Sequence, residues 1–256
     1  MNNKIKNKLS FGTALLLYGA FLALFIYLYP GRNNFDITAL ADKSELIFNG
    51  FLLTILISVI SLFFSFILGF FLYLAINSKK SLIKYLATIY NEVIFGIPLV
   101  VFLTFMYFFI FAPFRANISS DYSKIEPIIV GTISISIYMA PYMKNVFEGA
   151  IKSIDENQYQ AMTVFGFTPY QKYRYIILPQ LIKVIIPPLI GNFSYVIKST
   201  TLLHVVLVNE LYAEIKRASL TSLRIMEGYV LMFFLYLIIT IPLIQLAKWF
   251  ERRYGV

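Results

Sequence analysis

The chain has 256 residues, of which 59% are hydrophobic and only 14% charged, and its mean hydropathy is +0.74. Soluble domains are roughly half apolar and about one quarter charged, so this composition excludes an ordinary cytosolic enzyme and a disordered chain. The sequence has no cysteine and a single histidine, which excludes disulfides, thiolate chemistry and a multi-histidine metal site. Lipid is therefore the expected solvent of this chain.

Long stretches without charged residues predict the membrane spans. A bilayer core of about 30 Å needs roughly 20 apolar residues in a helix. The runs are too long, and alternate too little, for the strands of a barrel. The six candidate spans are, in chain order, 9–31, 46–78, 93–114, 127–143, 184–208 and 228–247. The predicted fold class is therefore all-α, a polytopic membrane helix bundle of about six transmembrane helices.

The basic residues predict how these spans are oriented. If the spans alternate, fourteen Lys and Arg fall on the side of the termini and seven on the other side. Cytoplasmic loops carry the excess of basic residues, so both termini are expected in the cytoplasm. The net charge of +9 then reflects topology and contact with lipid headgroups, and no nucleic-acid partner is expected.

The first span is preceded by three lysines and could be a cleaved signal peptide. Tyr27-Leu28-Tyr29-Pro30, however, is not a small-residue cleavage site, so we interpret the span as an uncleaved anchor. Residues 1–45 are expected to form this anchor helix and an extracytoplasmic loop. Residues 46–256 are expected to form one transmembrane domain, with a cytoplasmic loop at about 148–183.

Local signals in this loop predict a first short helix. Ser153 followed by Glu156 has the spacing of a capping box, so the helix is expected to start there. Gly166 is well placed as the left-handed residue that ends it. Ile154, Tyr159, Met162 and Phe165 are expected near one face, which could bind a partner protein or pack on the transmembrane bundle; the residues themselves leave both alternatives open.

A second short helix is predicted directly after the glycine. Thr168 is a candidate N-cap, Pro169 suits the first helical position, and Gln171 completes a capping box. The helix is expected to end near Pro179, because the residue before a proline avoids the helical conformation. The loop is thus predicted to be a helix, a glycine elbow and a helix outside the membrane.

This segment resembles the EAA loop of bacterial ABC-importer permeases, written E-A-A-x3-G-x9-I-x-L-P. The intervals of that pattern are all present, with Gln160 in place of Glu and Met162 in place of the second Ala. The resemblance implies that the matching residues couple the chain to a separate ATPase. These residues are Gln160, Ala161, Met162, Gly166, Ile176, Leu178 and Pro179.

The resemblance extends beyond the loop, over roughly residues 46–253. Over this length the chain resembles the permeases for histidine, lysine, arginine and glutamine. Asn145 and Ser199 stand where those permeases carry acids. The matching segments are Gly50 with Thr54, Ile55 and Ser58; Glu92 with Phe95-Gly96-Ile97-Pro98-Leu99; Tyr142 with Glu148-Gly149-Ala150-Ile151; Leu178-Pro179-Gln180; Ile186-Pro187-Pro188; and Lys198-Ser199-Thr200-Thr201-Leu202. Family members often have five spans, so the helix at 11–29 would be an addition.

The resemblance implies the permease subunit of an ATP-driven importer for polar amino acids, with the fold of type I ABC importers. A second permease subunit, identical or paralogous, would complete the pathway, ATPase subunits would bind beneath it, and an extracytoplasmic binding protein would deliver the cargo. No glycine-rich loop ending in Gly-Lys-Ser or Gly-Lys-Thr is present. The chain is therefore expected to be no enzyme, with no catalytic residue and no cofactor, and to reside in the bacterial inner membrane.

Polar residues inside the spans are candidates for the substrate pathway, because ionisable groups are costly in lipid. Lys198 could bind a substrate carboxylate or pair with Glu92, and the hydroxyls could instead hydrogen-bond neighbouring helices. His204 is interpreted as a hydrogen-bonding residue between helices, not as a ligand. The candidates for the pathway are Asn145, Asn192, Lys198, Ser199 and Thr200.

Other functions remain open at this point. A secondary transporter or channel for a small polar solute would need no partner ATPase, although the spans hold no acidic pair and no evident inverted repeat. A structural membrane subunit would need no pathway, and an ABC permease could carry a different small nutrient. Since Asn145 and Ser199 replace acids, either the cargo is neutral or anionic or the paired subunit supplies the charge, and the sequence leaves both alternatives open.

Overall fold

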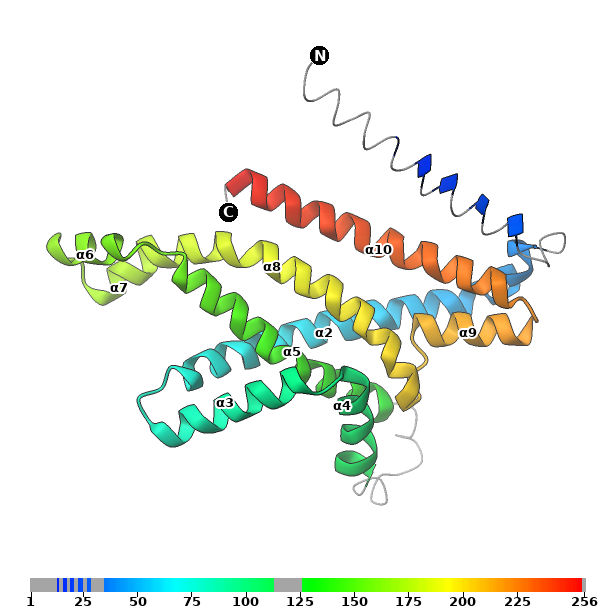
Figure 1. Ribbon diagram of the computed structural model, residues 1–256, viewed down its shortest axis with the longest axis horizontal. Helices are drawn as coiled ribbons and strands as arrows, with labels where there is room; N and C mark the ends of the chain where they lie inside the picture. Colours follow the sequence, from blue (N-terminus) through cyan, green and yellow to red (C-terminus); the bar gives the residue numbers. More distant parts are fainter. Residues whose placement is uncertain are drawn as a thin grey trace, which may run out of the picture.

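The computed structural model describes residues 35–112 and 126–254, and nine positions nearer the N-terminus (Figure 1). The predicted first span, 9–31, therefore lies mostly outside the described residues. Every regular element of the described chain is helical, which confirms the all-α fold class. The nine isolated positions are Thr13, Leu16, Leu17, Gly19, Ala20, Ala23, Leu24, Tyr27 and Leu28.

Nine α-helices and four helical segments of other pitch make up the described part of the chain. The α-helices are α2 (Ser44–Ile76), α3 (Ser81–Gly96), α4 (Leu99–Phe105), α5 (Glu126–Lys152), α6 (Glu156–Val164), α7 (Pro169–Gln171), α8 (Leu178–Ser199), α9 (Leu211–Thr221) and α10 (Ile225–Tyr254). The 3-10 segments are η2 (Ile37–Lys43) and η7 (Thr200–Val206), and the π-helical segments are η3 (Met106–Phe111) and η6 (Lys172–Ile177).

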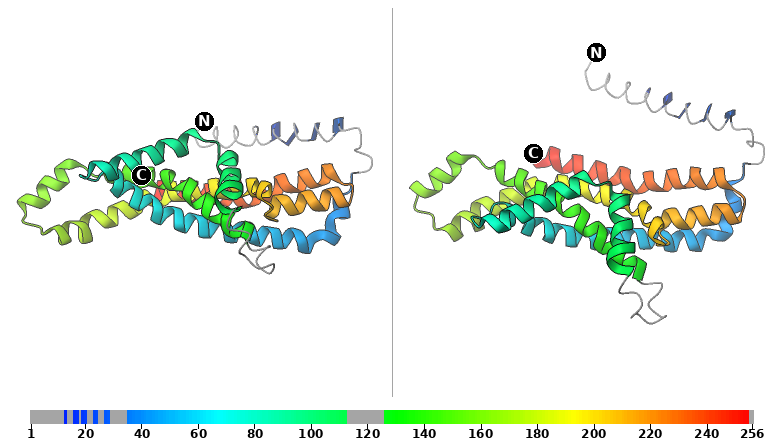
Figure 2. Two further views of the ribbon diagram at one scale, coloured as in Figure 1. Left: turned by 90° about the horizontal axis from the view of Figure 1, so that it is seen from below. Right: turned by 60° about the horizontal axis from the view of Figure 1, so that its bottom comes forward.

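The long helices run along one axis of an elongated bundle. α2, α8 and α10 lie along its length, with α6 and α7 at one end and α9 at the other (Figures 1 and 2). Three described stretches, 37–76, 169–206 and 225–254, are long and apolar enough to cross a membrane, and α3 with α4 would make a fourth. The described residues therefore have the helices of a polytopic membrane protein.

Small side chains let α2 and α5 approach closely, as is usual where lipid provides no hydrophobic force between helices. Ser58, Ser61 and Ser65 lie buried along α2. A Cβ atom added at Gly69 would lie 2.4 Å from the Cβ of Met143 and 2.8 Å from the carbonyl oxygen of Ala140. The two backbones are therefore in near contact, and this seam forms the centre of the bundle.

The predicted span 93–114 is not one helix. α3 ends at Gly96, α4 begins at Leu99, and the two helices are bent by 113°. The cause is Pro98, which holds the preceding Ile97 in an extended conformation (φ −106°, ψ 130°). The span is instead a broken one, composed of α3 and α4, and part of the predicted run belongs to each.

The expectation that the second loop helix ends near Pro179 was also wrong. Residues 169–206 form one continuous helical stretch of 38 residues. Pro179 lies directly after the π-helical η6, and this wider turn lets the helix continue through a residue that has no N–H to donate. The second half of the cytoplasmic loop is therefore a direct extension of a membrane-spanning helix.

Candidate functional site

The first loop helix, α6, begins slightly later than the capping-box spacing predicts. Its N-cap is Asp155, whose carboxylate accepts a hydrogen bond of 2.9 Å from the N–H of Asn157. Ser153 instead donates to the carbonyl oxygen of Ala150, at 2.7 Å, and so closes the end of α5. The capping box predicted from Ser153 is therefore wrong, because the nearer carboxylate takes the free N–H groups of α6.

The predicted glycine elbow is confirmed. Gly166 has φ +71°, in the left-handed region that favours glycine. The N–H of Phe167 donates to the carbonyl oxygen of Met162, and that of Gly166 donates to Thr163, both at 3.0 Å. This pattern is a Schellman motif, which closes the C-terminal end of α6 and turns the chain sharply.

The second half of the elbow is also as predicted. Thr168 caps α7, Pro169 follows at its first position, and Gln171 completes a reciprocal capping box. The side chain of Gln171 accepts from the N–H of Thr168 at 2.9 Å, and the Thr168 hydroxyl accepts from the N–H of Gln171 at 3.3 Å. Two caps and one glycine therefore define the shape of the tip.

One side of this tip packs on the chain's own helices. Ile154, Met162 and Ile177 form a small buried cluster, and Tyr159 and Ile176 pack against it. Met162 is thus a buried anchor of α6, and it is not available to a partner. Most of the predicted apolar face therefore packs on the chain's own helices instead of being free to bind a partner protein.

The other side of the tip is exposed. Val164 and Phe165 are 85% and 77% exposed, and Tyr170 is 69% exposed. Phe165 therefore does not share the buried face with Met162, as the spacing predicted. Among the predicted coupling residues, Gln160, Ala161, Gly166, Leu178 and Pro179 are also exposed. The apolar run on either side of Gly166 was the signal that could have identified this exposed knob.

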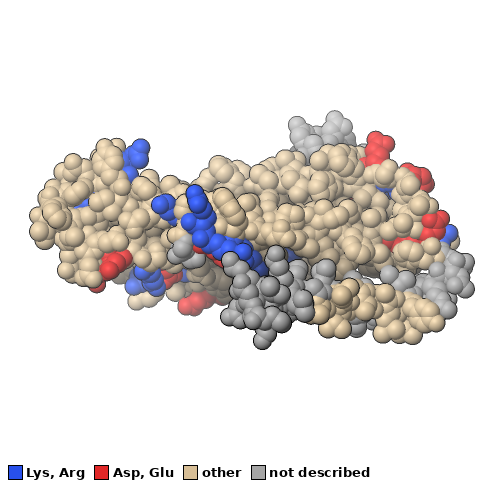
Figure 3. All heavy atoms as spheres, turned by 90° about the horizontal axis from the view of Figure 1, so that it is seen from above, with Lys and Arg blue, Asp and Glu red and all other residues tan. Residues whose placement is uncertain are grey.

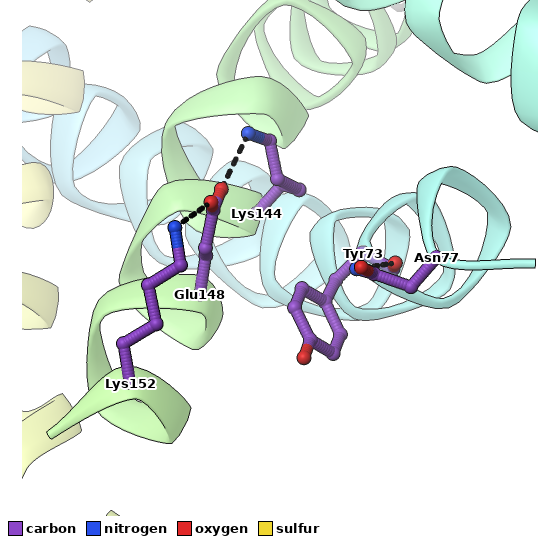
Figure 4. Close-up of polar contacts among 5 residues, drawn as sticks. All are labelled: Tyr73, Asn77, Lys144, Glu148 and Lys152. Atoms are coloured by element: carbon purple, nitrogen blue, oxygen red, sulfur yellow. Dashed lines mark hydrogen bonds and ion pairs between the residues drawn. The ribbon is translucent and has the colours of Figure 1, made fainter.

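Charged residues line the end of α5 that leads into the loop. Glu148 accepts hydrogen bonds from Lys144, at 3.0 Å, and from Lys152, at 2.6 Å (Figure 4). These two lysines hold the pKa of Glu148 below its ordinary value. Next to this cluster, Asn77 donates to the carbonyl oxygen of Tyr73 and closes the end of α2.

The proposed pathway residues do not form one cluster. Ser199 and Thr200 are buried, and their hydroxyls donate to the carbonyl oxygens of Tyr195, at 2.9 Å, and Ile197, at 2.8 Å, in their own helix. These two bonds lie within one helix, and the Thr200 side chain also interacts with Tyr236 of α10. Asn145 is exposed on α5, far along the chain from them.

Lys198 lies in a groove of about 590 Å³ between α8 and α10. The groove is lined mainly by apolar and aromatic side chains of α10, together with Thr201. Lys198 is exposed, and it forms no ion pair with Glu92 in the described structure. Asn192, farther back on α8, is half-buried, and its amide is 3.7 Å from the sulfur of Met143.

A buried acid at the other end of the bundle was missed by the sequence analysis. Glu210 is fully buried and accepts hydrogen bonds of 2.9 Å from the N–H groups of Tyr212 and Ala213, as the N-cap of α9. The hydroxyls of Thr54 and Tyr236 also donate to it, at 3.5 Å and 3.2 Å. Burial raises the pKa of Glu210 to about 7, although these donors oppose the shift.

His204 was expected to hydrogen-bond between helices. Its Nδ1 lies 2.6 Å from the carbonyl oxygen of Thr201, in the same helical segment. Its ring also contacts the ring of Tyr212 on α9, with 4.7 Å between the centroids. The ring therefore joins η7 to α9 through packing, and its hydrogen bond is local.

Charged side chains are unevenly distributed over the bundle. Figure 3 shows a largely uncharged face, with acidic side chains at the end where α2, α9 and α10 meet and again in the opposite half of the view. Lys and Arg lie mostly in the other half of that view. The uncharged middle is the surface expected of a chain surrounded by lipid.

Comparison with a family model adds an independent observation. Residues 65–256 match the family described as the binding-protein-dependent transport system inner membrane component. Similar proteins include a probable glutamine ABC transporter permease of Bacillus subtilis (strain 168), 30% identical over 218 residues, which are 85% of this chain and 97% of the relative. The glutamine transport system permease of Escherichia coli (strain K12) is 28% identical over 220 residues, 86% and 98% of the two chains.

Solved structures agree with this comparison. A crystal structure of an amino acid ABC transporter with histidines has a TM-score of 0.75 and 26% identity, over 85% of this chain and 98% of the other. The MetNI methionine ABC transporter, in inward-facing conformations, has a TM-score of 0.59 at 17% identity, over 80% and 96% of the two chains. The second likeness concerns the fold alone.

Proposed function

Since the chain belongs to the family of binding-protein-dependent transport system inner membrane components, we propose that it carries polar amino acids through the bacterial inner membrane. The chain is a permease subunit of an ABC importer, and ATP hydrolysis belongs to a separate subunit. The amino-acid cargo is supported by relatives whose names include glutamine permeases. The observation that carries the mechanism is the exposed tip at Gly166, built on an extension of a membrane-spanning helix.

The coupling role is assigned to residues by what they contact. Val164 and Phe165 offer an apolar knob to an ATPase, and Gln160 and Ala161 lie exposed on the same helix. Met162 and Ile176 hold α6 against the base of α8, and Gly166 sets the turn between them. Leu178 and Pro179 begin α8, so a displacement of the tip is passed directly into the spanning helix.

A co-purification experiment tests this assignment. Val164→Glu and Phe165→Glu place charge on the knob and should abolish co-purification of the co-expressed ATPase, because a buried unpaired charge is costly at an interface. Leu82→Glu is the matched control, since Leu82 is 73% exposed at the start of α3, between Lys80 and Lys84. Retention of the ATPase by both knob variants would refute the coupling site.

The substrate pathway is proposed to include Asn145, Asn192, Lys198, Ser199 and Thr200. Lys198 is the residue with the sharpest role, because it places a cation in an otherwise largely apolar groove of the membrane domain. We assign it to the carboxylate of the cargo. Ser199 and Thr200 have their hydroxyls bonded within the helix, so they contribute polarity near Lys198 more than free donors.

Uptake kinetics test this role. Lys198→Met in the assembled transporter should raise the KM for glutamine uptake, because it removes the cation that faces the carboxylate. Lys183→Met is the control on the same helix, where Lys183 lies 5.6 Å from the ring centroid of Tyr254, away from the groove. An unchanged KM in Lys198→Met would remove this residue from the pathway.

The partners and orientation complete the proposal. The family implies ATPase subunits and a substrate-binding protein, and we further propose a second permease subunit and cytoplasmic positions for both termini. The excess of Lys and Arg on the side of the termini supports this orientation. Reporters that fluoresce only in the cytoplasm, fused to either end, should both be bright, and a dark fusion would reverse the proposed topology.

A further inference from the structure

An apolar groove of about 770 Å³ lies between the beginning of α2 and the first half of α10. Its walls include Phe48 and Phe51 on one side and Leu231, Leu235 and Ile238 on the other. Phe48 is 58% exposed and Ile238 is 66% exposed. Glu45 is the charged residue of the lining and lies at the end of the groove where α2 begins. The groove can therefore receive an apolar helix along its length.

The chain itself reaches the rim of this groove. The N–H of Asp36 donates to the carboxylate of Glu227, near the start of α10, at 3.1 Å. Ile37, the next residue, already lines the groove. This hydrogen bond fixes the point at which the N-terminal part of the chain meets the bundle.

The uncharged run 9–31 lies just before this fixed point. Five residues, 32–36, separate the run from Ile37, and such a linker spans about 18 Å at most. As a helix, the run would be roughly 34 Å long, enough to cross a bilayer. Its end is therefore held next to the groove, and the short linker gives it a high effective concentration there.

The composition and charge of the run 9–31 also complement those of the groove. Leu16, Leu17, Leu24 and Leu28 are described as helical, are between 53% and 74% exposed and do not line the groove in this structure, so seating the run there would bury apolar surface that is now open. Arg32 follows the run directly and would come near Glu45 at the mouth of the groove. In lipid, close packing of complementary surfaces is what holds two helices together.

We propose that residues 9–31 cross the membrane as a helix seated in the groove between α2 and α10 of their own chain. This helix would run antiparallel to α2 and cover one flank of the domain. A second permease subunit would then have to bind to another face. The proposal concerns the additional N-terminal helix and does not depend on which solute is carried.

Cross-linking tests the proposal cleanly, since the natural chain has no cysteine. Two pairs join the run to the groove, Leu28→Cys with Phe48→Cys and Leu24→Cys with Leu231→Cys. The control pair is Leu28→Cys with Phe109→Cys, because Phe109 is 70% exposed on η3, which continues α4 on the side of the bundle away from α10 (Figure 1). A short bis-maleimide is added to membranes that contain the assembled transporter, and uptake before the reagent verifies folding.

Both groove pairs are expected to give a cross-link within a single chain, seen as a joined peptide in the monomer band. The control pair is expected to give no such cross-link. A cross-linked dimer would show that a second copy supplies the helix, and it would overturn the proposal. Free thiols in both groove pairs, in variants that still take up substrate, would equally overturn it. Uptake that fails in the unmodified chain would count against the proposed function alone.

Discussion

At the scale of single residues, the most unusual group is Glu210. Among the residues that the structure describes, no cation is paired with this carboxylate; it accepts hydrogen bonds from two backbone N–H groups and two hydroxyls. The bonds join α2, α9 and α10 at one point, so the acid acts as a structural junction. Protonation would remove the cost of burying the charge, whereas the N–H and hydroxyl donors favour the ionised form.

This junction predicts a pH dependence of stability. Because burial raises the pKa of Glu210 to about 7, above the unfolded value, the cost of its charge is present above about pH 7 and is relieved as the pH falls toward about 4.5. Thermal unfolding in detergent should therefore show a higher Tm near pH 5 than near pH 8. Glu210→Gln, which is neutral throughout, should lose this difference.

The matched control is Glu251→Gln, since Glu251 is exposed near the end of α10. It should keep the pH dependence of the natural chain. An equal response to pH in Glu210→Gln and the natural chain would show that Glu210 does not titrate across this range.

The sequence could not reveal Glu210 as a buried group. It follows a 3-10 segment and a left-handed Leu207 (φ 66°), and this irregular turn brings the chain back alongside α2. Charge patterns placed the residues between the last two spans in an extracytoplasmic loop. Burial in that region depends on long-range packing, which no local signal encodes.

At the scale of elements, the seam between α2 and α5 makes a sharp prediction. Gly69→Ala should destabilise the chain by about 1–3 kcal/mol, because the new methyl group meets the backbone of α5 and cannot be accommodated by a rotamer change. Gly149→Ala is the matched control inside α5, where an added Cβ meets nothing within 4 Å. That control should be neutral or slightly stabilising.

Thermal unfolding of both variants in the same detergent measures the difference. Equal midpoints for the two alanine variants would show that the close contact at Gly69 relaxes at no cost.

Local signals predicted the elements well where one residue decides the backbone. Gly166, Thr168 and Pro169 have the roles that their chemistry predicts. The errors arose where two signals competed: Asp155 replaced Ser153 as the cap, and a π-helical turn carried the helix through Pro179. The sequence also could not predict which residues of the tip are exposed, because exposure depends on how α6 packs on the other helices. Met162 in α6 is buried, whereas Phe165, the C-cap of α6, is exposed.

At the scale of the whole molecule, the continuous stretch 169–206 connects the tip to the centre of the bundle. Two glycines inserted after Arg174 would interrupt this rigid connection. The ATPase should still co-purify, since the knob is unchanged, but uptake driven by ATP should fall strongly. Such a loss is expected because a flexible joint cannot transmit the displacement.

The same insertion after Ser78, in the turn between α2 and α3, is the control, and it should leave uptake nearly unchanged. Normal uptake after the insertion at Arg174 would mean that the connection through η6 is not the route of coupling.

The wide turn at η6 also preserves the angular phase of the helix beyond it. A π-helical turn holds one more residue than a regular helix does, and each residue of an α-helix advances the chain by 100°. Deleting Tyr173 would therefore let a regular helix form with α8 in nearly the same angular phase relative to the tip. A one-residue deletion in the regular part of α8, ahead of Lys198, would instead turn Lys198 by about 100° out of its groove, so the wide turn absorbs a surplus residue without misaligning the two ends of the molecule.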